Sequence, residues 1–417
     1  MADVAAEFTE ATGILQDMYG GFKSSLQNKL DPLYAKLKPG TDKVSGQQFK
    51  FSVQVEQPQG VGNTLTATQV LPEAEPGEYI ELALQPVRSY GTLLFDRMML
   101  LAAGQNAAGK RAYVNYLENE MKGLKDHMAK EISRQLYGNK KGFICTCGVT
   151  AASTTLVLAA TAKMHQFAKR GHIDIVTTAT GIAIANGTNR IIQSVNVSAK
   201  TMVLDAAGGV VTTDNTMSVV RKGAYNAEAT GLADINSATV DIYGIVTATQ
   251  RRWQAYVAAA MGAWDVKKVI KIALEAGVEG GGDPNLLISC PDLQAQYWYQ
   301  LTGTRTVDVN NPAVPAKKLS TGYYELSIVL NGVECKWIAS NNCPSGELHA
   351  LCMEDLGLQH LAEPAFMNIN GQILLPNIYG TGGTPTNKAV IEYYWQMICT
   401  RRNSHIYMPG ITDIAGW

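Results

Sequence analysis

The stretch that decides the fold runs from residue 111 to residue 139 and reads RAYVNYLENEMKGLKDHMAKEISRQLYGN. Its apolar side chains recur every three or four residues, at Tyr113, Leu117, Met121, Leu124, Met128, Ile132 and Leu136. This period places them on one stripe of a helix of about six turns, roughly 35 Å long. Tyr137-Gly138-Asn139 is typical of a helix C-terminus. Because strand-like segments lie on both sides of it in the sequence, we expect this helix to be a spine beside a sheet.

Two segments with strand periodicity precede the helix. Apolar residues alternate at Phe49, Phe51, Val53 and Val55, and again at Ile80, Leu82 and Leu84. A long connection, broken by Pro58, Gly60 and Gly62, separates the two runs. A two-stranded ribbon is marginally stable in water, so we expect a neighbouring subunit to cover these seven side chains. A hairpin inside an ordinary sheet is the alternative that periodicity leaves open.

The rest of the chain mixes both periodicities. Between Ile173 and Asn236, short β-type runs alternate with Gly, Asn and Asp, which predicts a compact β subdomain inserted into the chain. A helical stripe follows from Val266, and Asn331-Gly332 marks a hairpin turn. Residues 390–398 predict a long strand rich in Tyr, Trp and Ile. The fold class that follows is α+β with several subdomains.

Composition limits the kinds of protein this chain can be. Its 417 residues are too many for one compact core, and only 17% are charged, against about 25% in a typical protein. We therefore expect partners to cover part of the surface. A net charge of -1 without a basic block argues against sequence-specific nucleic-acid binding. No signal-peptide core or membrane-spanning run is visible, so we expect the chain to fold in a cytoplasm.

Motifs for catalysis or cofactor binding are weak. Residues 104–111, GQNAAGKR, resemble a phosphate-binding loop, but Arg111 replaces the Ser or Thr that holds magnesium. Cys145 and Cys147 form a single Cys-x-Cys without a second pair, which indicates reduced thiols more than a zinc site. No Gly-x-Ser-x-Gly elbow occurs. We therefore predict that the protein is not an enzyme and has no catalytic residues, cofactor or metal; an unrelated α+β enzyme is an alternative.

The order of these elements resembles a known family. A β-arm, a long helix, an inserted β region, an α/β region and a long terminal strand follow one another in the major capsid proteins of tailed bacteriophages, which share the Hong Kong 97-type fold. Four local patterns are also similar to that family, at residues 223–232 (GAYNAEATGL), 283–291 (DPNLLISCP), 322–347 and 390–403.

The resemblance implies a division of the chain into six parts. These are an N-terminal arm (1–46), an extended β-loop (47–87), a peripheral domain with the spine helix (88–165), an inserted β-rich subdomain (166–236), an apical α/β domain (237–365) and return strands of the peripheral domain (366–417). By the same resemblance, Arg305 lies in a loop that points toward fivefold and sixfold centres. Arg401 and Arg402 are expected at contacts between subunits.

The function implied is a shell-building one. Copies of the chain would form pentamers and hexamers of an icosahedral head around double-stranded DNA, assembled in the bacterial cytoplasm and away from membranes. Further implied partners are a separate scaffolding protein, a portal and decoration proteins, with non-specific contact to the packaged DNA. An encapsulin-like cellular shell protein of the same fold is the second alternative.

Overall fold

The computed structural model describes most of the chain. The described residues are 31–37, 39–58, 60–61, 63, 74–96, 107–279, 281, 283–304, 326–369, 373, 375–376 and 386–412. Most of the predicted N-terminal arm and Arg305 lie outside these ranges.

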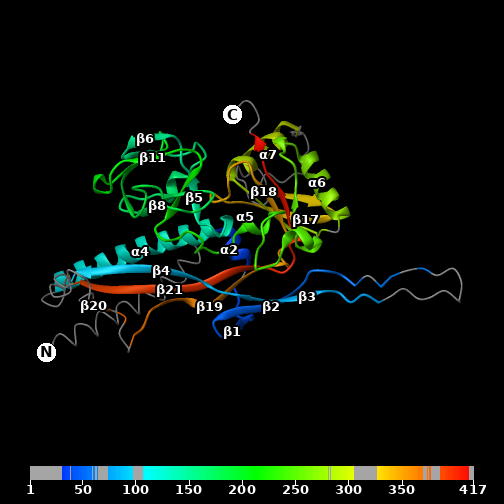
Figure 1. Ribbon diagram of the computed structural model, residues 1–417, viewed down its shortest axis with the longest axis horizontal. Coiled ribbons are helices and arrows are strands. Elements are labelled where there is room, and N and C mark those ends of the chain that lie inside the picture. Colours follow the sequence, from blue (N-terminus) through cyan, green and yellow to red (C-terminus); the bar gives the residue numbers. More distant parts are fainter. Residues whose placement is uncertain are drawn as a thin grey trace, which may run out of the picture.

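The predicted spine helix is confirmed. It is α4 (Ala107–Tyr137), and it lies along a sheet in which β21 (Thr386–Cys399) is flanked by β4 (Val87–Asp96) and β19 (Leu356–Phe366), both antiparallel to it (Figure 1). The short strand β20 (Leu375–Pro376) pairs with the start of β21. Helix and sheet are in close contact, because a Cβ atom at Gly91 of β4 would lie 2.7 Å from Met128 Sδ of α4.

The two alternating segments pair with each other, as expected. They form β2 (Gln48–Gln54) and β3 (Tyr79–Leu84), which are antiparallel with Phe49 opposite Leu84 and Gln54 opposite Tyr79. The short strand β1 (Val44–Ser45) adds to the outer edge of β2. Beyond these strands the ribbon extends far from the body of the molecule (Figure 1).

The inserted β region forms two sheets. Its larger sheet has the order β5-β12-β8-β9-β10-β7 and its smaller one pairs β11 with β6. The strands are β5 (Phe143–Thr146), β6 (Thr150–Ser153), β7 (Thr155–Val157), β8 (His172–Thr177), β9 (Arg190–Asn196), β10 (Thr201–Leu204), β11 (Val211–Thr213) and β12 (Met217–Arg221). Strands β5 to β7, which precede residue 166 in the sequence, belong to these sheets. The subdomain has an aliphatic core of its own, which includes Leu156, Ile175 and Ile192.

The apical domain is a mixed sheet with helices beside it. The sheet order is β13-β22-β18-β15-β17-β16, and a two-stranded sheet joins β14 to β23. The elements are α5 (Leu232–Ile235), β13 (Tyr256–Val257), β14 (Gly262–Ala263), α6 (Val266–Val278), β15 (Leu286–Ser289), α7 (Pro291–Thr304), β16 (Leu326–Leu330), β17 (Val333–Ala339), β18 (Leu348–Leu351), β22 (Ile406–Met408) and β23 (Ile411–Thr412). Strand β22, from the end of the described chain, pairs with β18 in this sheet.

The hairpin predicted at Asn331-Gly332 joins β16 to β17. Both turn residues have positive φ, 50° and 82°, which is the backbone that a tight two-residue turn requires. Among the described residues, no helix is both long and apolar enough to span a bilayer.

Candidate assembly surfaces and the contacts behind them

The seven apolar residues of the predicted arm lie at its root. Phe49, Val53 and Val55 are at most 1% exposed, Phe51, Leu82 and Leu84 are buried, and Ile80 packs half-buried against the same cluster. They belong to one core cluster, together with Trp253 and Trp395. The chain itself therefore covers these side chains. The expectation that a neighbouring subunit covers them does not hold for the root of the arm.

Beyond its root the arm exposes both backbone and side chains. Glu56 and Glu78 exchange backbone hydrogen bonds at 3.4 and 3.2 Å, so the ribbon continues past β2 and β3. Tyr79 is 66% exposed and Val61 is 92% exposed. An extended ribbon with exposed apolar groups has little reason to exist in a monomer, so this distal part is the candidate contact with another chain.

Arg402 has a structural position that the sequence did not indicate. Its side chain is fully buried, and its guanidinium donates to the carbonyl oxygens of Asp234 (2.7 Å), Ile235 (2.9 Å), Ser237 and Val240 (2.9 Å) and to the Thr247 hydroxyl (3.0 Å). Burial lowers the pKa of Arg402. With no exposed surface it offers nothing to a second subunit, so the expected contact is replaced by an internal one that holds the loop after α5.

The two other arginines expected at subunit contacts are Arg401 and Arg305. Arg401 is partly exposed, and its Nε donates to Asn403 Oδ1 at 2.8 Å. A subunit contact at Arg401 stays a prediction. Arg305 lies outside the described residues.

Asp31 ties three parts of the chain together at the start of α2 (Pro32–Leu37). Its Oδ1 accepts from the Tyr137 hydroxyl at 2.7 Å, its Oδ2 accepts from the Ser340 hydroxyl, and its backbone N–H donates to Ser133 Oγ at 3.1 Å. Burial, with Asp31 beside it, raises the pKa of Tyr137 well above its usual value. The segment before the arm is therefore anchored to both α4 and the apical domain.

Polar contacts join the inserted subdomain to the spine helix. Arg221 at the end of β12 donates to Glu131 Oε1 of α4 at 2.7 Å, and Arg134 pairs with both Glu131 and Glu228. Burial acts to raise the pKa of Glu131, but the two arginines lower it overall. Burial raises the pKa of Glu228, with Arg134 offsetting part of the effect. Removing one of these side chains would leave a buried charge without its partner, which costs free energy of folding. The ion pairs therefore hold the inserted subdomain on the spine helix.

A second tie runs from the inserted subdomain to the apical domain. Lys163 Nζ donates to the carbonyl oxygen of Asn341 at 2.5 Å and to that of Cys343. Burial lowers the pKa of Lys163. The subdomain is thus held by polar contacts on both sides, while its apolar core stays separate.

His405 is buried between two cysteines of the core. Its Nδ1 accepts from the backbone N–H of Cys352 at 3.2 Å, and its Nε2 lies 3.4 Å from Cys399 Sγ. Burial lowers the pKa of His405 from 6.5 to about 4. The ring is therefore neutral at physiological pH.

We expect His405 to make the folded chain acid-sensitive. In the unfolded chain the His405 ring binds a proton below pH 6.5, whereas in the folded chain it stays neutral until about pH 4. The folded state therefore loses stability as the pH falls from 6.5 to about 4. Between pH 7 and pH 4.5 this histidine should account for about 2 kcal/mol of the free energy of unfolding. Urea titrations of the unassembled chain and of the His405→Gln variant at both pH values measure it. Equal pH dependence in the two proteins would contradict the assignment.

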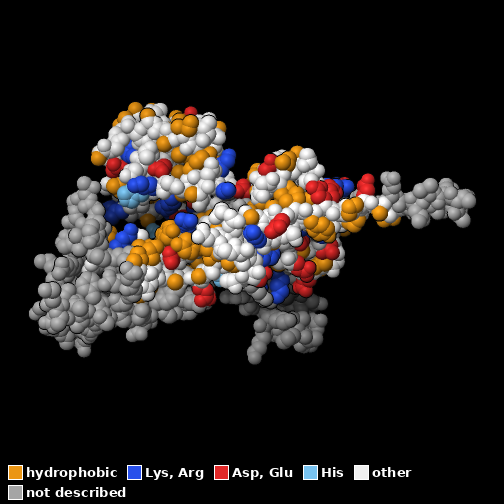
Figure 2. Space-filling model, turned by 60° about the horizontal axis from the view of Figure 1, so that its bottom comes forward, with side chains coloured by type: hydrophobic (Ala, Val, Ile, Leu, Met, Phe, Trp, Pro, Cys, Tyr) orange, Lys and Arg blue, Asp and Glu red, His pale blue; other side chains and the backbone are white. Residues whose placement is uncertain are grey.

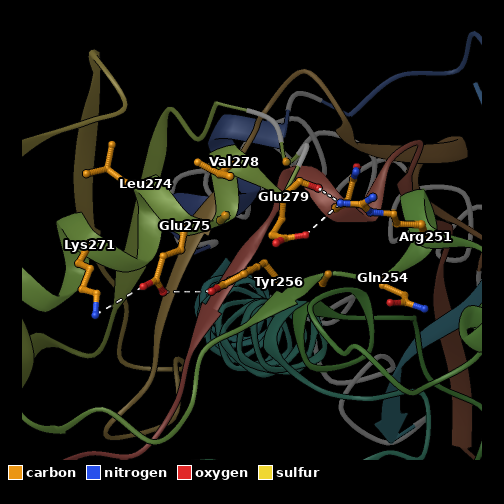
Figure 3. Close-up of a pocket in the computed structure, with 12 residues that line it drawn as sticks. Arg251, Gln254, Tyr256, Lys271, Leu274, Glu275, Val278 and Glu279 are labelled. Atoms are coloured by element: carbon orange, nitrogen blue, oxygen red, sulfur yellow. Dashed lines mark hydrogen bonds and ion pairs between the residues drawn. The ribbon is translucent and has the colours of Figure 1, made fainter.

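A surface groove of about 720 Å³ lies beside α6 (Figure 3). Its charged groups pair with one another: Arg251 with Glu279 at 2.9 Å, and Lys271 with Glu275 at 3.5 Å. The Tyr256 hydroxyl donates to Glu275 at 3.3 Å. No Ser, Thr, Cys or His is among the described lining residues. Leu274 and Val278 give the groove an exposed apolar rim.

The weak sequence motifs take ordinary places in the fold. Residues 107–111 of the phosphate-loop-like stretch form the first turn of α4, and its remainder lies outside the described residues. Burial raises the pKa of Cys145 above its usual range and that of Cys147 to about 12, so both are protonated thiols. Among the described residues, no three His, Cys, Asp or Glu side chains gather as metal ligands would.

The fold of the whole chain can be compared with those of known proteins. No family model and no curated protein matches the sequence. Among solved structures, the capsid asymmetric unit of cyanophage A-1(L) aligns with a TM-score of 0.51 and 12% identity, over 92% of this chain and 93% of that one. The chain has the fold of a phage capsid protein. This capsid fold is of the predicted α+β class.

Two other solved structures align with the chain at lower similarity. A structure from Mycobacterium phage Adephagia has a TM-score of 0.42 and 10% identity, over 93% of this chain and 91% of that one. A virus-like particle from Pyrococcus furiosus has a TM-score of 0.38 and 9% identity, over 93% and 98%.

Proposed function

We propose that the chain is the major capsid protein of a tailed bacteriophage, a structural protein whose copies assemble into an icosahedral shell around double-stranded DNA. The observation that carries this proposal is the alignment of 92% of the chain with a phage capsid subunit. The proposed partners are other copies of the chain, a separate scaffolding protein, a portal and decoration proteins, and the packaged DNA through non-specific contact. The proposed location is the virion, after assembly in the cytoplasm of a bacterial host.

The shape of the chain supports assembly. A closed shell needs surfaces on different sides of the subunit that are complementary to each other. The arm extends away from the body on one side, and the inserted subdomain lies above the spine helix (Figure 1). Exposed aliphatic or aromatic side chains occur on several parts, namely Tyr79 of the arm, Tyr90 and Leu94 of β4, Ile182 and Val197 of the insertion, and Leu274 and Val278 of α6.

The first experiment expresses the full chain in bacteria, alone and with a candidate scaffolding protein, and examines sedimenting material by negative stain. We expect closed, uniformly curved particles. Discrete small oligomers in every condition, without shells or tubes, would refute the proposal. Particles that enclose host enzymes and no DNA in the phage setting would favour the encapsulin-like alternative.

A variant with a shortened arm isolates the assembly contact from folding. Because Glu56 and Glu78 exchange backbone hydrogen bonds, residues 57–77 can be replaced by Asn-Gly, which closes a two-residue hairpin at that pair. The buried root stays intact, so the variant should keep its circular dichroism spectrum and melting temperature. We expect it to stay unassembled under conditions where the full chain forms shells. Normal shells from this variant would show that the distal arm is not an assembly contact.

A further inference from the structure

Helix α6 of the apical domain exposes a row of apolar side chains. Ile270, Leu274 and Val278 are 36%, 53% and 86% exposed, and because they are four residues apart they lie along one side of the helix. The buried side of the helix is made by Val269, Ala273 and Ala276. Figure 2 shows hydrophobic, acidic and basic side chains exposed side by side on the half of the molecule that carries the apical domain. A second apolar surface would stabilise such a row by covering it.

The charges of α6 stand in the reverse of the favourable order. Lys267 and Lys268 lie in its first turn. Glu275 and Glu279 stand at its C-terminal end. The helix dipole has its positive end at the N-terminus and its negative end at the C-terminus, so each of these side chains lies beside partial charge of its own sign. Asp265 offsets this in part, because its carboxylate accepts from the Lys267 N–H at 2.9 Å. Opposite charge supplied from outside would relieve the rest.

A second copy of the same helix supplies that charge when the two are antiparallel. Its glutamates then lie beside the lysines of the first helix, its apolar row covers the other row, and the two dipoles run in opposite directions. The same contact is made twice about a two-fold axis, as in an isologous interface. A parallel pair would bring lysine against lysine. The exposed side of α6 is therefore complementary to itself in one orientation, which favours a second copy as its partner.

The groove beside α6 leaves room for side chains of a second copy. Leu274 and Val278 stand on its rim (Figure 3). Its charged lining residues in the described chain form two ion pairs, Arg251 with Glu279 and Lys271 with Glu275. Both pairs are exposed, so each contributes little by itself and its charges can also attract those of another copy.

We propose that two copies of the chain associate through α6 in an antiparallel pair, with Lys267 of each copy facing Glu279 of the other and Leu274 near the two-fold axis. The inference goes beyond the proposed shell function, because it concerns a contact between two free chains. A helix of 13 residues is about 20 Å long, so the contact is small and belongs to the weak, transient class. We expect a dissociation constant in the micromolar range or above, which rises with salt as the charged ends are screened.

Charge reversal at the two ends of the helix tests the pairing. One variant carries Lys267→Glu and Lys271→Glu, and the other carries Glu275→Lys and Glu279→Lys; all four side chains are exposed. Sedimentation velocity of the soluble, unassembled chain over a concentration series measures self-association. Each variant alone should self-associate about tenfold more weakly than the wild type, because like charges then meet at both ends. An equimolar mixture of the two should associate at least as tightly as the wild type, since one α6 then has four glutamates at these positions and the other has four lysines.

The controls separate association from folding. The first variant adds acids near the helix N-terminus and the second adds bases near the C-terminus, so both agree with the helix dipole and should not lower the melting temperature. Leu274→Ala with Val278→Ala removes the apolar centre and should weaken association by a similar factor. Ile182→Ala with Val197→Ala on the inserted subdomain is the matched control, since these side chains are also exposed, and should leave association unchanged.

Three results would each overturn the inference. These are a wild-type chain that stays monomeric at every concentration, charge variants that self-associate like the wild type, and a mixture of the two variants that does not associate. The measurement uses free chains, so a failure to form shells would count against the proposed function and not against this contact.

Discussion

Replacing Arg402 by leucine is expected to lower the free energy of unfolding by about 3–5 kcal/mol, as breaking a buried, hydrogen-bonded charge site does. The guanidinium donates to four backbone carbonyl oxygens of residues 234–240. Leucine would leave those of Ile235 and Ser237 buried without this donor, whereas those of Asp234 and Val240 would keep the Ser237 N–H and the Thr247 hydroxyl. The Arg402 guanidinium carbon also lies 5.9 Å from the ring centre of Trp253, a second favourable contact that would be lost.

Chemical denaturation of the unassembled chain, followed by tryptophan fluorescence, measures the effect. Arg402→Lys keeps the charge but cannot reach all the carbonyls, so we expect it to restore only part of the stability. Arg401→Ala is the matched control: this neighbouring side chain is partly exposed, so its loss should cost under about 1 kcal/mol. A loss below 1 kcal/mol for Arg402→Leu would show that the loop finds other donors.

A methyl group at Gly231 is expected to destabilise the chain by about 3 kcal/mol, at the upper end for overpacking. Gly231 lies where the chain returns from the inserted subdomain to α5, against the end of α4. A Cβ atom there would lie 2.4 Å from the carbonyl oxygens of both Gln135 and Gly138. Both obstacles are backbone atoms, so relief requires the helix end and the returning chain to move apart.

Gly123→Ala is the matched control, with an effect of the opposite sign. Gly123 lies within α4, and a Cβ there meets nothing within 4 Å. Alanine should therefore stabilise the helix by about 0.5–1 kcal/mol. Thermal unfolding of both variants gives the comparison, and Gly231→Ala with wild-type stability would refute the close contact at the neck.

The elements with strong local patterns were predictable from sequence. The stripe of α4 has a single period over six turns, and Asn331-Gly332 fixes a turn by its own backbone preferences, so both follow without tertiary information. Strands β5 to β7 were missed as members of the inserted subdomain. They contain Thr, Ala, Ser and Cys with no clear alternation, and only pairing with β12, β11 and β10 makes them strands.

The candidate surfaces were less predictable because they depend on distant segments. Phe49 alternates as an arm residue would, but its burial is completed by residues more than two hundred positions later, such as Trp253. Arg402 has no local mark of its role, since the carbonyls that it binds come from residues near 235 and 240.

The pairing of β4 with β21 also determines when this sheet can form during translation. Trp395 Nε1 donates to Ser89 Oγ at 3.0 Å across a separation of 306 residues. At the usual pace of translation, β4 waits roughly 15 to 60 seconds on the ribosome before its partner emerges. The sheet beside the spine helix, and the Trp395-containing core at the arm's root, can be completed only when residues 386–399 are made. We therefore expect products of translation that stop before β21 to be excluded from the assembly that we propose.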